Sequence, residues 1–130
     1  MNVHVSISTG PLPPAQTHAA PGAGAIVVFE GVVRAREGDR EIEAIHYETY
    51  EPMAQNTLAA LGEELCARHE LLEMRIEHSR GRVAVGECSF RLTVVSSHRK
   101  EALSAMDEFI DRMKRDVPIW KRPRPPISPA

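Results

Sequence analysis

Two lysines near the end of the sequence are the first candidates for chemistry. Lys114 and Lys121 are seven residues apart, and the segment between them contains Pro118, Ile119 and Trp120. An ammonium group held among apolar side chains is partly desolvated, which lowers its pKa and allows the lysine to act as a nucleophile or general base near neutral pH. The residues support a second interpretation equally well, in which Lys121 is a solvated charge and Lys114 complements the negative end of a helix.

The pair His98-Arg99 is the second candidate. It follows Ser96 and Ser97, and serine is a typical capping residue at the start of a helix. The first turn of a helix presents free backbone N–H groups and the positive end of the helix dipole, so cationic side chains there favour binding of a phosphate or carboxylate. The alternative is a capped surface helix that carries these charges without a ligand.

Arg34 and Phe29 are the third candidates, on one stretch that is rich in β-branched residues. Gly31 lies between them, and a glycine inside a strand indicates a bulge or a close backbone approach. An arginine just beyond such a glycine either faces a cleft or lies on the ordinary surface. From the pattern alone, Phe29 fits a core position better than a platform for a ligand.

Motifs for phosphate loops, metals and disulfides are missing from the sequence. It contains no GxGxxG, no GxxxxGK[ST] and no HExxH. His46 and Glu48 on one strand are too few ligands for a metal site, and we predict neither a metal nor a cofactor. Cys66 and Cys88 show no CxxC spacing, so we interpret them as reduced, small apolar residues.

Charge is unevenly distributed along the 130 residues. The formal net charge is −2, which argues against a general nucleic-acid-binding protein. The basic segment, residues 112–124, nevertheless holds six basic residues and one acid, so its net charge is +5 while the rest of the chain carries −7. Such a concentration of positive charge predicts an anionic partner.

The elements that position these residues follow from hydrophobic periodicity and from helix and turn signals. We predict a single domain over residues 1–122, which includes a proline-rich N-terminal segment 1–24, and an extended or disordered tail over 123–130. Short connections between strands favour an α+β fold, a mainly antiparallel sheet with helices packed on one side. The pattern predicts strands at 3–7, 25–34 (buried), 42–49, 74–79, 82–85 and 89–96, and helices at about 52–69 and 98–115.

Two further expectations concern the second helix and the location of the protein. Leu103, Met106, Ile110 and Met113 recur at helical spacing and are expected to form the buried face of that helix. No apolar run reaches the length of a membrane span, and no secretory signal is visible at the N-terminus. We therefore expect a cytoplasmic protein.

Five stretches occur together in an order and spacing that resemble one known family. Over roughly residues 24–122 the sequence closely resembles the large, catalytic subunit of molybdopterin synthase. The stretches are GAIVVFEGVVR (Gly24–Arg34), HYETYEPMA (His46–Ala54), GRVAVGE (Gly81–Glu87), VVSSHRKEA (Val94–Ala102) and DRMKRDVPIWKR (Asp111–Arg122).

The resemblance implies an α/β-hammerhead fold and a sulfurtransferase activity. In this family, sulfur from the C-terminal Gly-Gly thiocarboxylate of a small ubiquitin-like carrier subunit is transferred to cyclic pyranopterin monophosphate. The product is the dithiolene of molybdopterin, a step of molybdenum cofactor biosynthesis. The resemblance also implies a homodimer within a heterotetramer. It implies no bound cofactor or metal, because molybdenum is inserted later.

The resemblance also implies roles for individual residues. Lys114 matches a lysine regarded as catalytic, and Lys121 matches the second essential lysine. Arg34, His98 and Arg99 match residues that bind the anionic substrate, His98 and Arg99 partly across the dimer interface.

Phe29 matches an aromatic residue of the same pocket.

Two other interpretations remain: a non-catalytic module that binds an acidic or ubiquitin-like C-terminal tail through the basic segment, and a nucleic-acid-associated protein that uses the same segment.

Overall fold

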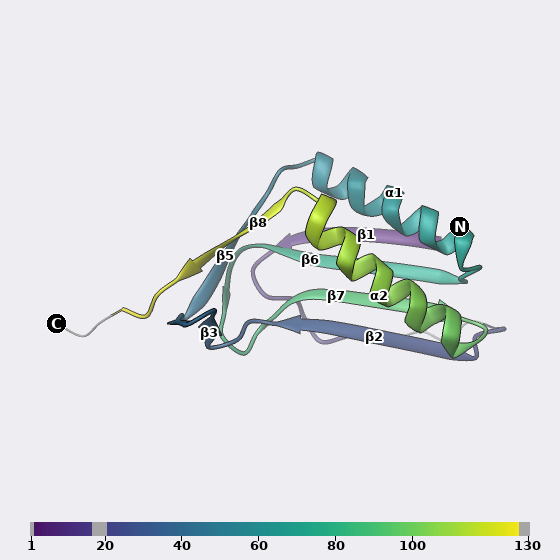
Figure 1. Ribbon diagram of the computed structural model, residues 1–130, viewed down its shortest axis with the longest axis horizontal. Helices are drawn as coiled ribbons and strands as arrows, with labels where there is room; N and C mark the ends of the chain where they lie inside the picture. The colour runs from purple at the N-terminus through teal and green to yellow at the C-terminus, as the bar shows by residue number, and fades with distance from the viewer. Residues whose placement is uncertain (1, 17–20, 128–130) are drawn as a thin grey trace.

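Strand β6 (Glu73–Ala84) is the centre of the sheet, because three other strands pair with it. The computed structural model describes residues 2–16 and 21–127 (Figure 1). The first part of β6 pairs in parallel with β1 (Asn2–Thr9) and, on its other side, antiparallel with β7 (Cys88–Ser96). Residues 81–84 of β6 pair antiparallel with β5 (Ala44–Thr49). One strand therefore joins two groups of strands.

The outer strands complete these two groups. β2 (Ala25–Val32) pairs antiparallel with β7 and forms one edge of the sheet, and β8 (Ile119–Arg124) pairs antiparallel with β5 at the other end. In Figure 1, β5 and β8 run at an angle to β2, β7 and the first part of β6. β3 (Arg36–Glu37) and β4 (Arg40–Glu41) form a separate short hairpin. All pairings except that of β1 with β6 are antiparallel.

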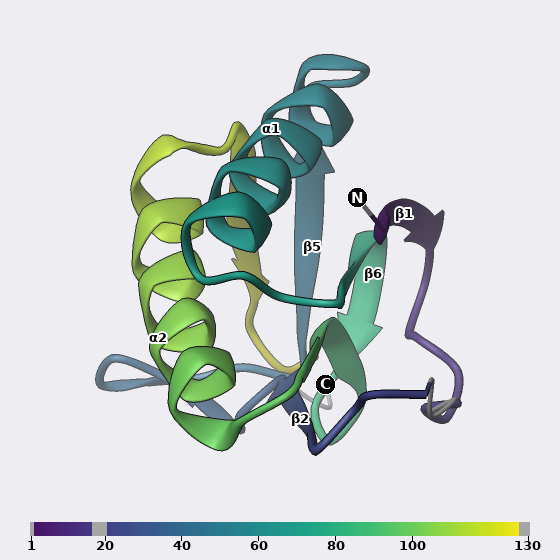
Figure 2. The ribbon, with the colours of Figure 1, turned by 90° about the vertical axis from the view of Figure 1, so that its right-hand side faces the viewer.

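Both helices pack on the same face of the sheet. Figure 2 shows α1 (Met53–Arg68) and α2 (Arg99–Asp116) side by side in one layer. This arrangement confirms the predicted α+β fold, a mainly antiparallel sheet with helices on one side. The core between the layers contains fully buried side chains from both helices and from the sheet, among them Leu58, Leu65, Ile76, Leu92 and Phe109.

The strand predicted at 25–34 is shorter than expected and is not buried. β2 ends at Val32, and Ile26, Val28, Phe29 and Val32 are each at least 36% exposed. The reason is its position, since an edge strand has a neighbour on one side only. A run of β-branched residues is compatible with a central strand or with an apolar edge, and periodicity alone does not separate the two.

The two strands predicted at 74–79 and 82–85 are one continuous strand. Gly81 has φ +77°, a left-handed backbone conformation that glycine adopts without a Cβ clash. The chain changes direction there and changes its partner from β1 and β7 to β5 without leaving the sheet. A glycine that was expected to end a strand therefore bends it.

The buried face of α2 differs in part from the predicted one. Ala102, Ala105, Met106 and Phe109 are buried, whereas Leu103 is 51% exposed. Small alanines allow the helix to approach the sheet closely, and Phe109 fills the space beneath it. The residue before the helix is His98, and no side-chain bond caps the helix.

The C-terminal strand extends past the predicted domain boundary at residue 122. β8 continues through Pro123 and Arg124, both paired with β5, and residues 128–130 of the predicted tail lie outside the described residues. Trp120 is 53% exposed, so it does not anchor the tail in the core. Neither helix in the described part of the chain is long and apolar enough to cross a membrane.

Candidate functional site

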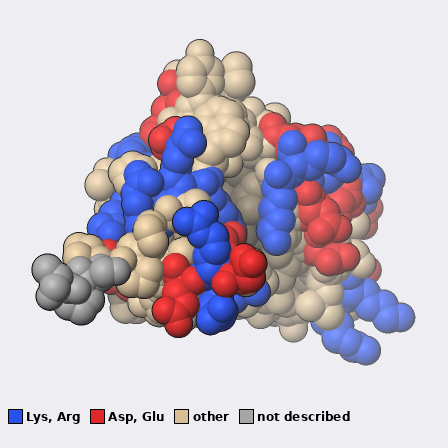
Figure 3. Space-filling view, turned by 60° about the vertical axis from the view of Figure 1, so that its left-hand side comes forward, with Lys and Arg blue, Asp and Glu red and all other residues tan. Residues whose placement is uncertain are grey.

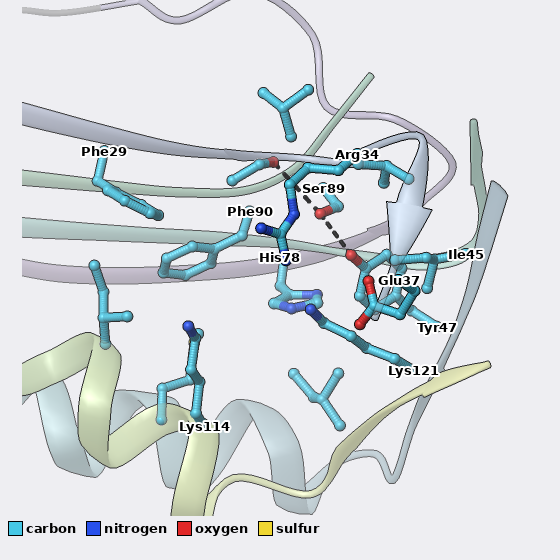
Figure 4. Close-up of a pocket in the computed structure, with 16 residues that line it drawn as sticks. Phe29, Arg34, Glu37, Ile45, Tyr47, His78, Ser89, Phe90, Lys114 and Lys121 are labelled. Carbon is cyan, nitrogen blue, oxygen red and sulfur yellow. Dashed lines mark hydrogen bonds between the residues drawn. The ribbon is translucent and has the colours of Figure 1, made fainter. Parts of the chain in front are cut away.

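A cavity of about 420 Å³ lies where the end of α2, the start of β8 and the end of β2 meet. Four of the six predicted site residues line it: Phe29, Arg34, Lys114 and Lys121. Figure 4 shows them coming from different elements, with Lys114 on α2, Lys121 on β8, Phe29 on β2 and Arg34 just after β2. The fold thus brings together residues that are up to 92 positions apart in the sequence.

The turn between α2 and β8 places the two lysines in the cavity. The Val117 N–H donates to the Met113 carbonyl at 3.1 Å, and Val117 is buried, so the helix ends against the core. Pro118 cannot continue a helix, and its carbonyl accepts a hydrogen bond from the Tyr50 N–H at 3.1 Å. The chain then turns back as β8, in which Lys121 is paired with Tyr47 of β5.

Lysine is rare in this chain, which makes the placement of two lysines informative. The sequence contains only three, Lys100, Lys114 and Lys121. Two of them line the cavity, and neither forms an ion pair with another described residue. The charges of Lys114 and Lys121 are therefore not neutralised by an ion pair with a carboxylate of the described residues.

A bulge places Arg34 beside the cavity. The register between β2 and β7 shifts between Gly31 and Val32. A Cβ on Gly31 would lie 3.4 Å from the Phe90 Cβ, an ordinary contact distance, so space alone does not require a glycine here. Beyond the bulge, buried Val33 donates its N–H to the Glu87 carbonyl, and Arg34 follows in the cavity wall.

A row of rings, which we call the aromatic wall, lines one side of the cavity and consists of Phe29, Phe90, His78 and Tyr47. The ring centroids of Phe29 and Phe90 are 6.1 Å apart, those of Phe90 and His78 are 5.8 Å apart, and those of His78 and Tyr47 are 5.1 Å apart. Phe29 is 40% exposed and lines the cavity, so it is not the core residue that its pattern suggested. A row of flat apolar faces beside cations suits a ligand that has both a ring and negative charge.

Sequence reasoning missed the polar groups of this wall. The Tyr47 hydroxyl and the Ser89 hydroxyl are 2.8 Å apart in a buried hydrogen bond, and burial raises the pKa of Tyr47. His78 is 5% exposed, and burial lowers its pKa. A signal for His78 was present in the sequence, because it has the same parity in its strand as Met74 and Ile76, which are both fully buried.

The cavity is positively charged. Arg34, Lys114 and Lys121 are its cations, and Glu37 is the one carboxylate among the described residues that line it. All three cations belong to exposed residues, and the single carboxylate does not balance their charge. The cavity is therefore suited to an anion.

His98 and Arg99 lie at the opposite end of α2. They line a shallow hollow together with Gly24, Ser97 and Lys100. His98 and Lys114 are sixteen residues apart on one helix, roughly 24 Å at about 1.5 Å per residue. Within one chain, the structure does not bring His98 and Arg99 to the cavity.

The excess charge of the basic segment is partly neutralised by carboxylates from other elements. Arg112 donates to Glu64 at 3.0 Å, and Arg122 donates to Glu48 at 2.8 Å. Figure 3 looks toward the end of the molecule formed by β5 and β8, where Lys and Arg side chains gather with Asp and Glu among them. A mixed surface of this kind does not favour the nucleic-acid interpretation, which needs a continuous basic face.

The described residues contain no group of three or more His, Cys, Asp or Glu side chains that could hold a metal ion. Cys66 and Cys88 are free thiols, and burial raises the pKa of both. A raised pKa leaves these thiols protonated and weakly nucleophilic near neutral pH. Neither cysteine is among the described residues that line the cavity.

Comparison with known proteins places the chain in a family. The model of the family described as MoaE protein matches residues 7–116. A molybdopterin synthase catalytic subunit from Aspergillus niger is 35% identical over 125 residues, which cover 94% of this chain and 69% of that protein.

Solved structures agree with this match. Molybdopterin synthase from Staphylococcus aureus has a TM-score of 0.80 and 32% identity, with 92% of each chain covered. A complex of subunits 1 and 2 of molybdopterin-converting factor from Helicobacter pylori has a TM-score of 0.74 and 25% identity, covering 92% of this chain and 83% of that one. The chain belongs to the family of molybdopterin synthase catalytic subunits.

Proposed function

We propose that this chain transfers sulfur from the C-terminal thiocarboxylate of a small ubiquitin-like carrier subunit to cyclic pyranopterin monophosphate, which forms the molybdopterin dithiolene. The observation that carries the proposal is the cavity, in which two of the three lysines of the chain lie beside Arg34 and an aromatic wall. Both reactants are anions, one of them with a flat ring system. The cations and the aromatic faces match these two properties. The reaction takes place in the cytoplasm.

Lys114 and Lys121 are the catalytic residues of this proposal. Opening a cyclic phosphate and adding sulfur to carbon both require proton transfers, and a lysine can supply or accept a proton where an arginine cannot. Arg34 binds the phosphate, since its planar guanidinium presents paired donors to an anion. Phe29 contacts the ring system of the substrate. The catalytic domain comprises residues 1–122, and the last two residues of β8 lie just beyond this boundary.

The carrier subunit reaches the cavity with its C-terminal tail. The Helicobacter pylori structure is a complex of two subunits of molybdopterin-converting factor, which supports a small partner subunit for this chain. A tail that ends in Gly-Gly has no side chains beyond Cα, so it is narrow enough for a cavity of about 420 Å³ that must also hold a substrate. Its terminal negative charge is attracted by the ammonium groups of Lys114 and Lys121, which form no ion pair with the residues that the structure describes.

His98 and Arg99 act in this proposal from a second copy of the chain. β2 begins beside the hollow that His98 lines, because Gly24, the residue just before the strand, also lines it. The strand ends at the cavity. If two β2 edges pair antiparallel about a two-fold axis, the start of one strand lies beside the end of the other. The pairing would bring His98 and Arg99 of the partner subunit toward the cavity.

The exposed edge of β2 supports such a pairing. Within the described residues β2 has a strand neighbour only in β7, and Ile26, Val28 and Val32 present apolar side chains that are at least 36% exposed. Unpaired edges of this kind are prone to pair with another chain. A homodimer that carries one carrier subunit at each cavity gives the heterotetramer.

Reconstitution tests the proposed function. The purified chain is mixed with thiocarboxylated carrier and cyclic pyranopterin monophosphate, and dithiolene product is measured. The control reaction contains the same carrier with an ordinary C-terminal carboxylate and should yield no product. If the thiocarboxylated carrier binds and no product forms, the chain is a non-catalytic tail-binding module and the enzymatic proposal is wrong.

A further inference from the structure

His78 is a buried histidine in the wall of the cavity, and the proposed chemistry does not yet use it. It lies on β6, is 5% exposed and lines the cavity with Lys121. Buried histidines usually have a partner for both ring nitrogens. The position of this imidazole beside a catalytic lysine is therefore the starting point for a further role.

One hydrogen bond determines which nitrogen of His78 carries the proton. The ring Nδ1 lies 2.7 Å from the backbone carbonyl oxygen of Ser79. A carbonyl oxygen can only accept, so Nδ1 is the donor and carries the hydrogen. In the neutral ring, Nε2 is then a lone-pair acceptor. Within residues 2–16 and 21–127, no group forms a hydrogen bond with Nε2.

The neighbouring rings hold the imidazole in one orientation. Tyr47 meets it edge-on, with an interplanar angle of 81°, and Phe90 packs at 46°. The Tyr47 hydroxyl is itself bound to Ser89, so this ring is also held in place. A ring flip of His78 would break the bond to Ser79 and would place a different nitrogen toward the cavity. Nε2 therefore has a defined position.

Several ionisable groups face His78 from the elements around the cavity. Tyr47 comes from β5, Lys121 from β8 and Lys114 from α2, while Arg34 and Glu37 line the wall near the end of β2. The charge of Lys121 contributes to the lowered pKa of His78, after the larger effect of burial. Figure 4 shows the end of the Lys121 side chain beside the imidazole ring.

We propose that His78 is a positioning residue for Lys121. The unprotonated Nε2, which has no partner among the described residues, is free to accept a hydrogen bond from the Lys121 ammonium when Nζ moves toward it, and this bond holds Nζ inside the cavity. A lysine side chain has four rotatable bonds, and an unrestrained one on an exposed strand spends much of its time in solvent. Only the neutral imidazole can do this, because an imidazolium has no lone pair and repels an ammonium. The inference deepens the proposed function, on which its catalytic part rests.

Titration of the histidine ring tests the contact without any enzymatic assay. Nitrogen NMR of the ¹⁵N-labelled chain should show His78 as the Nδ1–H tautomer. Lys121→Ala should raise the pKa of His78, because a neighbouring positive charge has been removed. Arg115→Ala, at an exposed position of α2 outside the cavity, is the matched control and should leave the titration unchanged. An Nε2–H tautomer, or equal titrations in the wild type and in Lys121→Ala, would overturn the proposal.

Turnover of two substitutions then tests the positioning role. His78→Gln places an acceptor oxygen near the position of Nε2, whereas His78→Phe fills the space between the rings without an acceptor. Loss of a hydrogen bond to a charged group predicts that His78→Phe lowers kcat roughly ten-fold. The KM for the carrier should change little, and His78→Gln should retain most of the wild-type kcat. Equal loss in both variants would indicate a packing role and contradict the proposal.

A matched substitution controls for the loss of a partly buried histidine. His69 lies at the end of α1, outside the cavity, and its Nε2 is 3.4 Å from a Glu108 oxygen. His69→Phe should leave kcat unchanged. The two experiments separate the possible failures. If titration shows the contact and the wild type forms no product, the proposed function is wrong, and if product forms without the contact, the role of His78 is wrong.

Discussion

Lys114 and Lys121 line the same cavity although one belongs to a helix and the other to a strand. The chain reverses direction between them at Val117 and Pro118. Strand β8 pairs with β5 immediately afterwards, and this pairing sets Lys121 opposite Tyr47. The spacing of the two lysines in the sequence thus becomes a fixed spatial relationship through one turn and one strand pairing.

Removal of one ammonium group should abolish most of the turnover. Lys114→Ala is expected to lower kcat by about 10²–10⁴-fold, the usual contribution of a general acid or base. Arg115→Ala is the matched control, since Arg115 is the next residue of α2, is exposed and pairs with Asp116. Its turnover should remain close to that of the wild type. Equal turnover in Lys114→Ala and the wild type would remove Lys114 from the catalytic site.

Mixing two inactive variants should restore activity if each site combines two copies of the chain. A Lys114→Ala chain still supplies Arg99, and an Arg99→Ala chain still supplies Lys114. Each mixed dimer then contains one complete site, and random mixing predicts about a quarter of the wild-type activity. Activity is measured after the two chains have been unfolded and refolded together. A mixture as inactive as its components would show that Arg99 acts elsewhere.

Glu51 should make the stability of the fold depend on acid pH. The Arg80 guanidinium holds the pKa of the Glu51 carboxyl at about 2, below its ordinary value of 4.5. A lowered pKa means that the stabilisation is fully present above pH 4.5 and is lost as the pH falls toward about 2. Both side chains are partly exposed, so the contribution near neutral pH is about 1 kcal/mol.

Urea unfolding of Glu51→Gln at several pH values measures this contribution. The difference in unfolding free energy from the wild type should be largest at neutral pH and should shrink between pH 4.5 and 2. Glu63→Gln, on the exposed side of α1, is the control and should show little difference at any of these values. A difference that stays constant with pH would mean that the Glu51–Arg80 pair does not titrate as described.

Arg91 should be important for stability rather than for turnover. Its side chain is 3% exposed and donates to Glu30 at 2.8 Å and to the Pro13 carbonyl at 2.6 Å, which ties β7 to β2 and to the N-terminal segment. Arg91→Met leaves Glu30 and Glu77 without this partner. Because both carboxylates are partly exposed, the cost is that of lost hydrogen bonds to charged groups, about 2 kcal/mol. Thermal or urea unfolding measures the loss.

Arg75→Met is the matched control for Arg91→Met. Arg75 lies on the neighbouring strand β6 and has a longer contact of 3.7 Å with Glu73, at a more exposed position. Its substitution should cost less than about 1 kcal/mol. Equal losses of unfolding free energy in the two variants would show that the burial of Arg91 does not increase the stability contributed by its ion pairs.

Local patterns predicted the elements well where one physical signal dominated. The helices predicted at about 52–69 and 98–115 agree with α1 and α2 to within a residue or two at each end. The strand predicted at 89–96 agrees equally well with β7. The sequence contains no comparable signal for the position of a strand within the sheet. The β-branched residues of β2 predicted burial, but only the pairing order shows that this strand is an edge.

The candidate site was predictable only in part for a similar reason. Arg34 and Lys121 were predictable, because Arg34 lies just beyond a glycine in an apolar stretch and Lys121 follows a proline and two apolar residues. His78 and Tyr47 were not, because each lies in a strand with a plausible core pattern, and their contact depends on the bend of β6 at Gly81. The separation of His98 from Lys114 followed from the sequence, because the helix predicted over 98–115 already placed the two residues at its opposite ends.

Cross-linking of the carrier tail to the chain tests most directly whether the cavity is where sulfur is delivered. A carbodiimide joins the C-terminal carboxylate of the carrier's Gly-Gly to a nearby amine, and the three lysines of the chain serve as reporters. Peptide mapping by mass spectrometry should find the terminal glycine on Lys114 or Lys121. A map in which the terminal glycine is attached to neither Lys114 nor Lys121 would contradict the account.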